Sequence, residues 1–405
     1  MTLFCYGRSW RLTSGGRLAR HITHGGTYLD ELCSKVLPPS KNYPTRFLFQ
    51  FIPKCIAPNL ITFTGFLCVA TVVLMMYIHD YELYAVGGRP GETGGRPGET
   101  GGQYGIPHWV FTLSGVLVFL AYNLDGLDGK QARRLGVSGP LGELFDHGLD
   151  SYIVFLIPYA IISIFGRDKE FSLPCFRGFL IVLSVVLNFY VSHIEKYNTG
   201  VLYLPWGYDL SMWASSFLFI VAGACGPQFY KVYIVSMTFV QNFEIVCHLM
   251  GVFTTFPMAA YNIYMSYKNR TGQMHSFTEA LRPTWSLLTV TVAMVYWAQF
   301  SHNDIIEYDP RAFIFLYGTL FSNIASRLII AEMSHQRCEL VNWFLWPLLT
   351  GIVMSLTLPQ LEVTILYTLM MAAFLAHVHY GVCVVRQICE HLNISCFTVP
   401  KAKRK

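Results

Sequence analysis

Long apolar runs, separated by short polar segments, recur along most of the chain. A helix needs roughly 20 mostly apolar residues to cross a lipid bilayer, and several of these runs approach or reach that length. The pattern predicts ten membrane-crossing helices, although some of the runs fall short of the full length. They lie at residues 60–78, 108–124, 151–166, 176–192, 211–224, 242–266, 284–300, 311–331, 341–358 and 362–385. We therefore expect an all-α, polytopic membrane protein.

The composition supports a membrane protein over a soluble protein of the same length. By length alone, 405 residues would allow roughly two or three soluble domains. However, 53% of the residues are hydrophobic and only 13% are charged, whereas ordinary globular chains carry about 25% charged residues. The net charge of +5 comes without a basic run interleaved with aromatic residues, so we expect no nucleic-acid partner. The eleven cysteines show no zinc-binding spacing and are interpreted as apolar packing residues.

Three segments depart from the apolar pattern and divide the chain. Residues 1–46 form an atypical, arginine-bearing tail, for which a cytosolic location is favoured over a mitochondrial transit peptide. Residues 87–105 contain GGRPGET twice, and this density of glycine and proline predicts a flexible insertion. Residues 391–405 are a basic tail, for which lipid binding, a retention signal and simple solubility all stay open. The membrane-embedded domain is expected to cover residues 47–390.

The charged residues of the membrane domain are concentrated in one stretch, residues 123–151. Asp125 and Asp128 are three residues apart, and Asp146 and Asp150 are four apart, so each pair shares one face of a helix. The sequence GVSGP between the pairs is a strong turn signal, which predicts a helix, a turn and a second helix. We expect the two helix ends to direct four carboxylates at one point.

Four carboxylates at one point would repel one another unless cations lay between them. Hard oxygen ligands favour Mg²⁺, with Mn²⁺ or Ca²⁺ as alternatives. Two metal ions that share a carboxylate cluster form a clamp for phosphate chemistry. The alternative is a helix hairpin with solvated charges at the membrane surface. That alternative suits any single acidic residue, but it does not explain the whole set at this spacing.

Further residues of the same stretch suggest catalysis. His147 and Glu143 are four residues apart, so the carboxylate could orient the imidazole as a general base. General-base catalysis contributes about 10²–10⁴ in rate. Arg133 and Lys130 supply positive charge for phosphate oxygens.

The stretch also carries a family signature. The string Asp125-x2-Asp-Gly-x2-Ala-Arg-x8-Gly-x3-Asp-x3-Asp150 resembles, without a mismatch, that of the CDP-alcohol phosphatidyltransferase family. Members of this family are integral membrane proteins that move a phospho-alcohol from a CDP carrier to a lipid or alcohol hydroxyl. The resemblance implies two divalent ions, Mg²⁺ or Mn²⁺, bound by the four aspartates. It also implies that Arg133, Gly129 and Gly142 contact the CDP group, where the glycines let the backbone approach closely.

Two further similarities narrow the expected chemistry. Glu143 and His147, in GELFDHGLDS, are similar to the branch whose acceptor is diacylglycerol, where the histidine takes the hydroxyl proton and the glutamate strengthens it as a base. The sequence APNLIT at the start of the first predicted helix is similar to the family's first helix, so the resemblance assigns Asn59 to CDP binding. The residues alone favour helix capping for Asn59 and Thr62.

The segment 193–209, HIEKYNTGVLYLPWGYD, is expected to be a cytosolic loop and most resembles the ethanolamine-specific branch of the family. Glu195 either accepts hydrogen bonds from a primary ammonium group or is a solvated loop residue, and both alternatives stay open. Recognition of choline would commonly use an aromatic cage instead. His193 is interpreted as a structural residue at the membrane rim.

The expected activity is transfer of phosphoethanolamine from CDP-ethanolamine to 1,2-diacylglycerol. The first alternative is a choline or dual-specificity transferase with the same chemistry. The second, from a different class, is a non-catalytic membrane scaffold or a divalent-cation transporter. Transporters tend to place acidic residues near the middle of the bilayer, on broken helices, whereas these aspartates lie beside charged loop residues.

The distribution of positive charge predicts the orientation of the chain in the membrane. Ten spans place both termini on one side, and lysine and arginine are concentrated in the tails and loops of that side. By the positive-inside rule this side is cytosolic, so the aspartate cluster faces the cytosol. The resemblance further implies residence in the endoplasmic reticulum membrane, or in the Golgi, and a homodimer.

Overall fold

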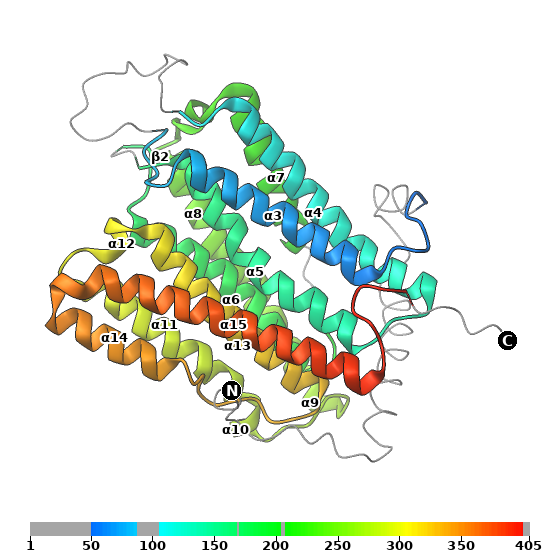
Figure 1. Cartoon of the computed structure of the whole chain (residues 1–405). Coiled ribbons are helices and arrows are strands. Elements are labelled where there is room, and N and C mark those ends of the chain that lie inside the picture. The colour runs from blue at the N-terminus through cyan, green and yellow to red at the C-terminus, as the bar shows by residue number, and fades with distance from the viewer. Residues whose placement is uncertain (1–49, 87–104, 168–169, 204–206, 400–405) are drawn as a thin grey trace. The chain divides into compact units, whose positions relative to one another are not determined.

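Helices dominate the computed structural model, which describes residues 50–86, 105–167, 170–203 and 207–399 (Figure 1). Within these ranges the strands are limited to β1 (Tyr233–Ile234) and β2 (Met237–Thr238), which pair antiparallel. The all-α class is confirmed. The predicted N-terminal tail, residues 87–104 of the predicted insertion and residues 400–405 lie outside the described part of the chain.

In the described part of the chain, eight helical segments are long and apolar enough to cross a membrane. These are α3 (Pro58–His79), α4 (His108–Leu135), α5 (Pro140–Phe165), α6 (Cys175–Thr199), α7 (Gly207–Cys225), Phe239–Asn269, α13 (Pro310–Met333) and Pro359–Leu392. The sixth consists of α8 (Phe239–Met250), the π-helical η2 (Gly251–Thr255) and α9 (Phe256–Asn269), and the last of the short η3 (Pro359–Leu361) and α15 (Glu362–Leu392). The remaining elements are the short η1 (Pro227–Tyr230), α10 (Phe277–Ala280), α11 (Arg282–Phe300), α12 (Ile305–Tyr308) and α14 (Leu345–Thr357).

All ten predicted membrane segments coincide with helices, but two of them, α11 and α14, are not among the eight spans. Several helices also extend beyond their predicted ends. The helix predicted at 108–124 continues to Leu135, and the helix predicted at 176–192 continues to Thr199. Charged residues expected beside or beyond the membrane helices therefore lie on their ends.

Helix α13 is the most buried of the eight spans in the described part of the chain. In an apolar stretch of 18 residues within α13, 89% is buried inside the protein. In the corresponding stretch of the last span, which contains α15, only 22% is buried. It packs against α5, α6 and α15. At Gly318 the contact with α5 is so close that a Cβ atom would lie 2.3 Å from the ring of Phe155. Small residues commonly allow such close approach between membrane helices.

Helix α4 packs between α3 and α7, and α3 also packs against α5. A Cβ atom on Gly115 of α4 would lie 2.6 Å from the side chain of Ile220 on α7, so glycine brings these two backbones together. The segment that precedes α3 is held by α4, because the Gln131 amide donates to the carbonyl oxygens of Pro53 and Ile56 at 3.0 and 3.1 Å. These contacts fix the ends of α3, α4 and α5 relative to one another.

The opposite end of α5 is tied to α6 and α12 by Glu307. Its carboxylate accepts a hydrogen bond from Arg167 Nη2 at 2.7 Å and another from the backbone N–H of Cys175 at 2.6 Å. Burial alone would raise the pKa of Glu307, but these two hydrogen bonds lower it below its ordinary value. The ion pair thus helps to close the helix bundle at the end far from the charged stretch.

Candidate active site

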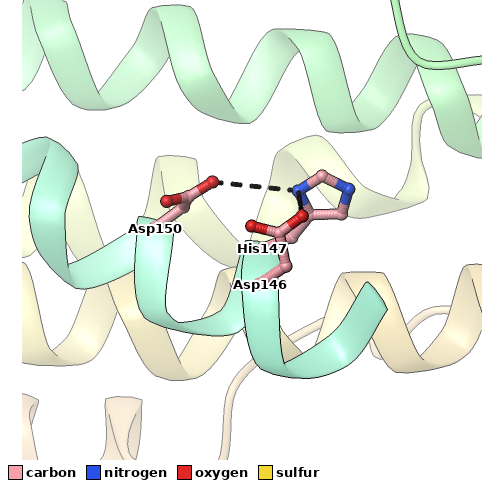
Figure 2. A group of neighbouring side chains, drawn as sticks. All are labelled: Asp146, His147 and Asp150. Carbon is pink, nitrogen blue, oxygen red and sulfur yellow. Dashed lines mark ion pairs between the residues drawn. The ribbon is translucent and has the colours of Figure 1, made fainter. Parts of the chain in front are cut away.

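The four predicted aspartates come together between the C-terminal half of α4 and the N-terminal half of α5. Ligand atoms of Asp125, Asp128 and Asp146 all lie within 4.8 Å of one another. Asp146, His147 and Asp150 form a second group under the same limit, and Figure 2 shows these three side chains on consecutive turns of α5. Asp146 belongs to both groups, so it joins the pair on α4 to the pair on α5.

The turn between the two helices is built as its sequence predicts. Gly136 ends α4 with a φ of 66°, in the left-handed region that glycine adopts without strain. Pro140 begins α5 in the first turn, where the missing N–H of proline is not needed. The chain reverses within a few residues and brings the two aspartate pairs together.

Two hydroxyl groups from other helices hold the aspartates of α4. Thr62 Oγ1 of α3 donates to Asp128 Oδ2 at 2.5 Å, and the Tyr208 hydroxyl of α7 donates to Asp125 Oδ2 at 3.0 Å. The capping role predicted for Thr62 and Asn59 is wrong, because the N-cap of α3 is Ala57 and no side chain caps it. Thr62 instead orients a predicted metal ligand.

The arrangement suits a divalent cation. Asp146 Oδ1 is buried and has no hydrogen-bond partner among the described residues. A buried acceptor without a partner is costly, and this one lies where the two carboxylate groups meet. The ligand set of carboxylate oxygens, with one imidazole nearby, fits a hard ion such as Mg²⁺ or Mn²⁺.

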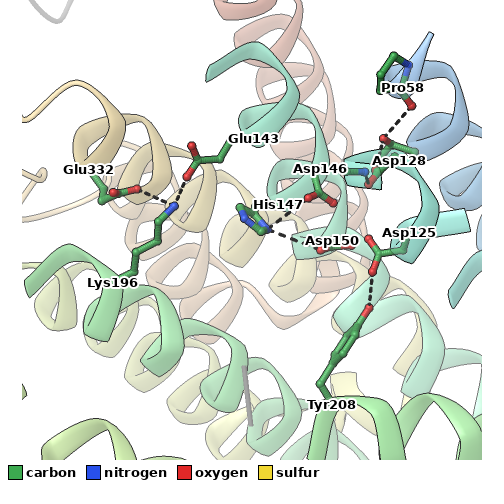
Figure 3. A network of polar contacts seen from close by, with 12 residues as sticks. Pro58, Asp125, Asp128, Glu143, Asp146, His147, Asp150, Lys196, Tyr208 and Glu332 are labelled. Atoms are coloured by element: carbon green, nitrogen blue, oxygen red, sulfur yellow. Dashed lines mark hydrogen bonds and ion pairs between the residues drawn. The ribbon is translucent and has the colours of Figure 1, made fainter. Parts of the chain in front are cut away.

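His147 lies between the aspartates and a second charged cluster (Figure 3). Its Nδ1 is 3.9 Å from Asp146 Oδ2 and 3.9 Å from Asp150 Oδ2. Its ring also meets the ring of His193 on α6 in an edge-on contact, with 5.4 Å between ring centroids. The imidazole is thus held beside the carboxylates by its neighbours on two helices.

The expected hydrogen bond between Glu143 and His147 is not present among the described residues. Glu143 Oε1 instead accepts a hydrogen bond from Lys196 Nζ of α6. The same ammonium group pairs with Glu332 Oε2 of α13 at 3.0 Å. Sharing a helical face is therefore not enough to pair Glu143 with His147, because a buried cation from another helix takes the carboxylate.

The range that the family comparison matches contains the aspartate cluster. The sequence model of the family described as CDP-alcohol phosphatidyltransferase matches residues 55–240. The chain is 40% identical to ethanolaminephosphotransferase 1 of Homo sapiens over 357 aligned residues. The alignment covers 87% of this chain and 86% of the human protein. This chain belongs to the CDP-alcohol phosphatidyltransferase family. It is a membrane-embedded transferase of phospholipid biosynthesis.

Other members of the family extend the comparison. The identity is 39% over 358 residues to ethanolaminephosphotransferase 1 of Mus musculus, covering 87% of this chain and 86% of that protein. It is 26% over 398 residues to choline/ethanolaminephosphotransferase 1 of Arabidopsis thaliana, covering 91% of this chain and 93% of that protein. The chain therefore resembles relatives whose names state ethanolamine alone and a relative whose name states both alcohols.

The residues that the family resemblance assigns to CDP form two pairs, and the members of each pair are neighbours in space. Asn59 Oδ1 is 3.8 Å from the position of a Cβ atom on Gly142, and its Nδ2 donates to the carbonyl oxygen of Cys396 at 3.0 Å. Arg133 Nη1 is 3.5 Å from the position of a Cβ atom on Gly129. A Cβ atom at either glycine would make only ordinary van der Waals contact with its neighbour, so the contact of these residues with CDP stays a prediction.

The segment expected to be a loop after α6 departs from its prediction. Its first seven residues, 193–199, are the last turns of α6. Glu195 is only 2% exposed and accepts a hydrogen bond from Asn262 Nδ2 of α9 at 2.6 Å, so a solvated loop position is wrong. His193 is buried against the rings of His147 and Phe189, which supports a structural role for it.

Sequence reasoning missed several residues that shape the site of this transferase. Lys196 and His193 are three residues apart in HIEK, a spacing that places both on one helical face, although the polar residues of this segment predict a loop. Glu332 is a lone acidic residue near the end of an apolar helix, which is by itself a functional signal in a membrane protein. The hydroxyls of Thr62 and Tyr208 gave no such signal.

Proposed function

We propose that this protein transfers phosphoethanolamine from CDP-ethanolamine to the free hydroxyl of 1,2-diacylglycerol, giving phosphatidylethanolamine and CMP. The observation that carries the proposal is that four aspartates and His147 form two adjoining groups that share Asp146, in a chain of this family. The similarity over most of the chain to proteins named ethanolaminephosphotransferase supports the ethanolamine head group.

The aspartates would hold the cofactor and through it the donor. Asp125 and Asp128 from α4, with Asp146 and Asp150 from α5, would bind two divalent ions, Mg²⁺ or Mn²⁺. When bound, such ions draw negative charge from the diphosphate and stabilise the departing nucleotide. Thr62 and Tyr208 keep two of these carboxylates in place, because their hydroxyls donate to Asp128 and Asp125.

His147 is the proposed general base. Its Nδ1 faces the carboxylates of Asp146 and Asp150, and Figure 2 shows Nε2 turned away from them. Nε2 takes the proton of the diacylglycerol hydroxyl. The hydroxyl oxygen forms a bond to the phosphorus that carries ethanolamine, and the bond from that phosphorus to the CMP oxygen breaks. Arg133 supplies positive charge to the departing phosphate.

The two substrates reach the site from different phases. The donor is water-soluble and comes from the cytosol, the side on which the sequence places most lysine and arginine residues. The acceptor is a lipid and enters sideways from the bilayer. We assign the protein to the endoplasmic reticulum membrane, or to the Golgi, and expect a homodimer from the family.

A radiolabelled donor assay tests the proposal. Purified protein in micelles that contain diacylglycerol and Mg²⁺ should convert labelled CDP-ethanolamine to labelled phosphatidylethanolamine, and EDTA should stop the reaction. An Asp146→Asn variant should lose this activity, because Asp146 belongs to both carboxylate groups. Failure of the wild-type protein to label lipid from any CDP-alcohol would refute the transferase proposal.

A dual or choline-specific transferase is the second candidate, favoured by the similarity to the Arabidopsis thaliana relative. Competition between CDP-ethanolamine and CDP-choline on the purified protein separates the two. An ethanolamine enzyme should show a higher kcat/KM for CDP-ethanolamine. Equal kcat/KM values for the two donors would indicate a dual-specificity enzyme, and a higher value for CDP-choline would indicate a choline enzyme. The proposed chemistry would be the same in both cases.

A further inference from the structure

Lys196 is a buried cation that joins three helices beside the proposed general base. Its side chain is 3% exposed, and its ammonium group contacts Glu143 of α5 and Glu332 of α13. A buried charge is costly unless it is paired, and this one has two carboxylate partners. Figure 3 shows this cluster on one side of His147 and the four aspartates on the other.

We propose that Lys196 and Glu332 are positioning residues for the transfer reaction and act through Glu143. The inference rests on the proposed function, since it needs a reaction whose rate can be measured. Glu143 lies one helical turn before His147 on α5, and Lys196 fixes its carboxylate from α6. Glu332 in turn fixes the ammonium group from α13.

The geometry explains why the cluster affects the reaction and not only the fold. Helix α6 presents two neighbouring residues to α5: Lys196 binds Glu143, and His193 packs against the ring of His147. Loss of the ammonium group leaves the carboxylates of Glu143 and Glu332 facing each other without a cation, so they repel each other and α5, which carries His147, shifts against α13. A misplacement of about 1 Å at reacting groups costs about 10²-fold in rate.

The family signature does not assign this role to either residue. Glu332 lies outside residues 55–240, the range that the family model matches, and Lys196 lies outside the aspartate motif. A second ion pair on the same helix provides a matched control. Arg177 donates through Nε to Glu244 Oε1 of α8 at 2.9 Å, near the opposite end of α6 from Lys196.

The experiment uses the full chain in mixed micelles with diacylglycerol, Mg²⁺ and labelled CDP-ethanolamine. We compare Lys196→Met, Lys196→Arg, Glu332→Gln and the control Arg177→Met by kcat, by KM for each substrate and by unfolding temperature. Lys196→Met should lower kcat about 10²-fold, with KM for CDP-ethanolamine within about twofold. Glu332→Gln should lower kcat less, and Lys196→Arg should restore part of the rate. Arg177→Met should lower the unfolding temperature and leave kcat within about twofold.

A double variant tests the route through Glu143. In a Glu143→Gln background, Lys196→Met should lower kcat by no more than about twofold further, because the partner through which it acts is gone. If Lys196→Met lowers kcat by the same factor in the Glu143→Gln background as in the wild type, the inference is wrong.

Two other outcomes also overturn the inference. One is a kcat within twofold of wild type for Glu332→Gln and Lys196→Met. The other is an equal loss of kcat in Arg177→Met. If Lys196→Met does not fold, Glu332→Gln decides, since it keeps the shape of the side chain. An inactive wild-type protein would instead refute the proposed function.

Discussion

Replacing Thr62 by valine tests whether Asp128 is held in place to bind a metal ion. The substitution removes the hydroxyl that donates to Asp128 Oδ2 at 2.5 Å and puts a methyl group of similar size in its place. Thr62 is 6% exposed and Asp128 is 4% exposed, so water does not readily replace the lost donor. The backbone N–H of Gly129 still donates to the other oxygen of Asp128.

The size of the effect follows from this geometry. A hydrogen bond to a charged group contributes about 1.5–3 kcal/mol. Loss of a side chain that orients a metal ligand costs about 10- to 100-fold in metal affinity or activity, which corresponds to about 1.4–2.7 kcal/mol. The two estimates agree. We therefore expect the Mg²⁺ concentration for half-maximal activity to rise about 10- to 100-fold in Thr62→Val.

The assay measures initial rates of labelled phosphatidylethanolamine formation over a range of free Mg²⁺ at saturating CDP-ethanolamine. The matched control is Thr64→Val on the same helix. Thr64 is exposed and donates to the carbonyl oxygen of Leu60 at 2.7 Å, so its loss should not change the Mg²⁺ dependence. At saturating Mg²⁺, Thr62→Val should approach the wild-type rate.

The reasoning is refuted if Thr62→Val and Thr64→Val have the same half-saturating Mg²⁺ concentration as the wild type. In that case the hydroxyl would not support a metal ligand, and the position of Asp128 would not be set for a cation. A lower rate at saturating Mg²⁺ with an unchanged Mg²⁺ dependence would count against it in the same way.

Three further predictions follow from the same contacts. His147→Ala should lower kcat about 10²–10⁴-fold while Mn²⁺ binding, measured by calorimetry, persists; loss of Mn²⁺ binding would make the imidazole a metal ligand. Gly318→Ala should destabilise the fold by about 1–3 kcal/mol in a thermal or denaturant titration, because its Cβ would meet the Phe155 ring. The lowered pKa of Glu307 stabilises the folded state above the ordinary value of 4.5, and this contribution is lost as the pH falls through the lowered pKa. The unfolding temperature of Glu307→Gln should therefore depend less on pH below 4.5 than that of the wild type. If both proteins show the same pH dependence there, the proposed role of the ion pair between Glu307 and Arg167 is wrong.

Much of the site was predictable because its parts are local. The spacing of the aspartates places each pair on one face of a helix whatever surrounds it, and the glycines and proline between the pairs set the turn. The long apolar runs select helices in a membrane, since only internal hydrogen bonding satisfies their backbone there. The sequence therefore determined the helical class, the aspartate pairs and the reversal of the chain that brings them together.

The tertiary structure decided which groups meet across helices. Glu143 and His147 share a face, but Lys196 arrives from α6 and takes the carboxylate. The polar residues of HIEKYN indicated a loop because their partners lie on other helices and are invisible in the local pattern. In the fold, Glu195 meets α9, Lys196 meets α5 and α13, and the helix continues. A buried polar group keeps its place only through partners that satisfy it, and those partners are far away in the chain.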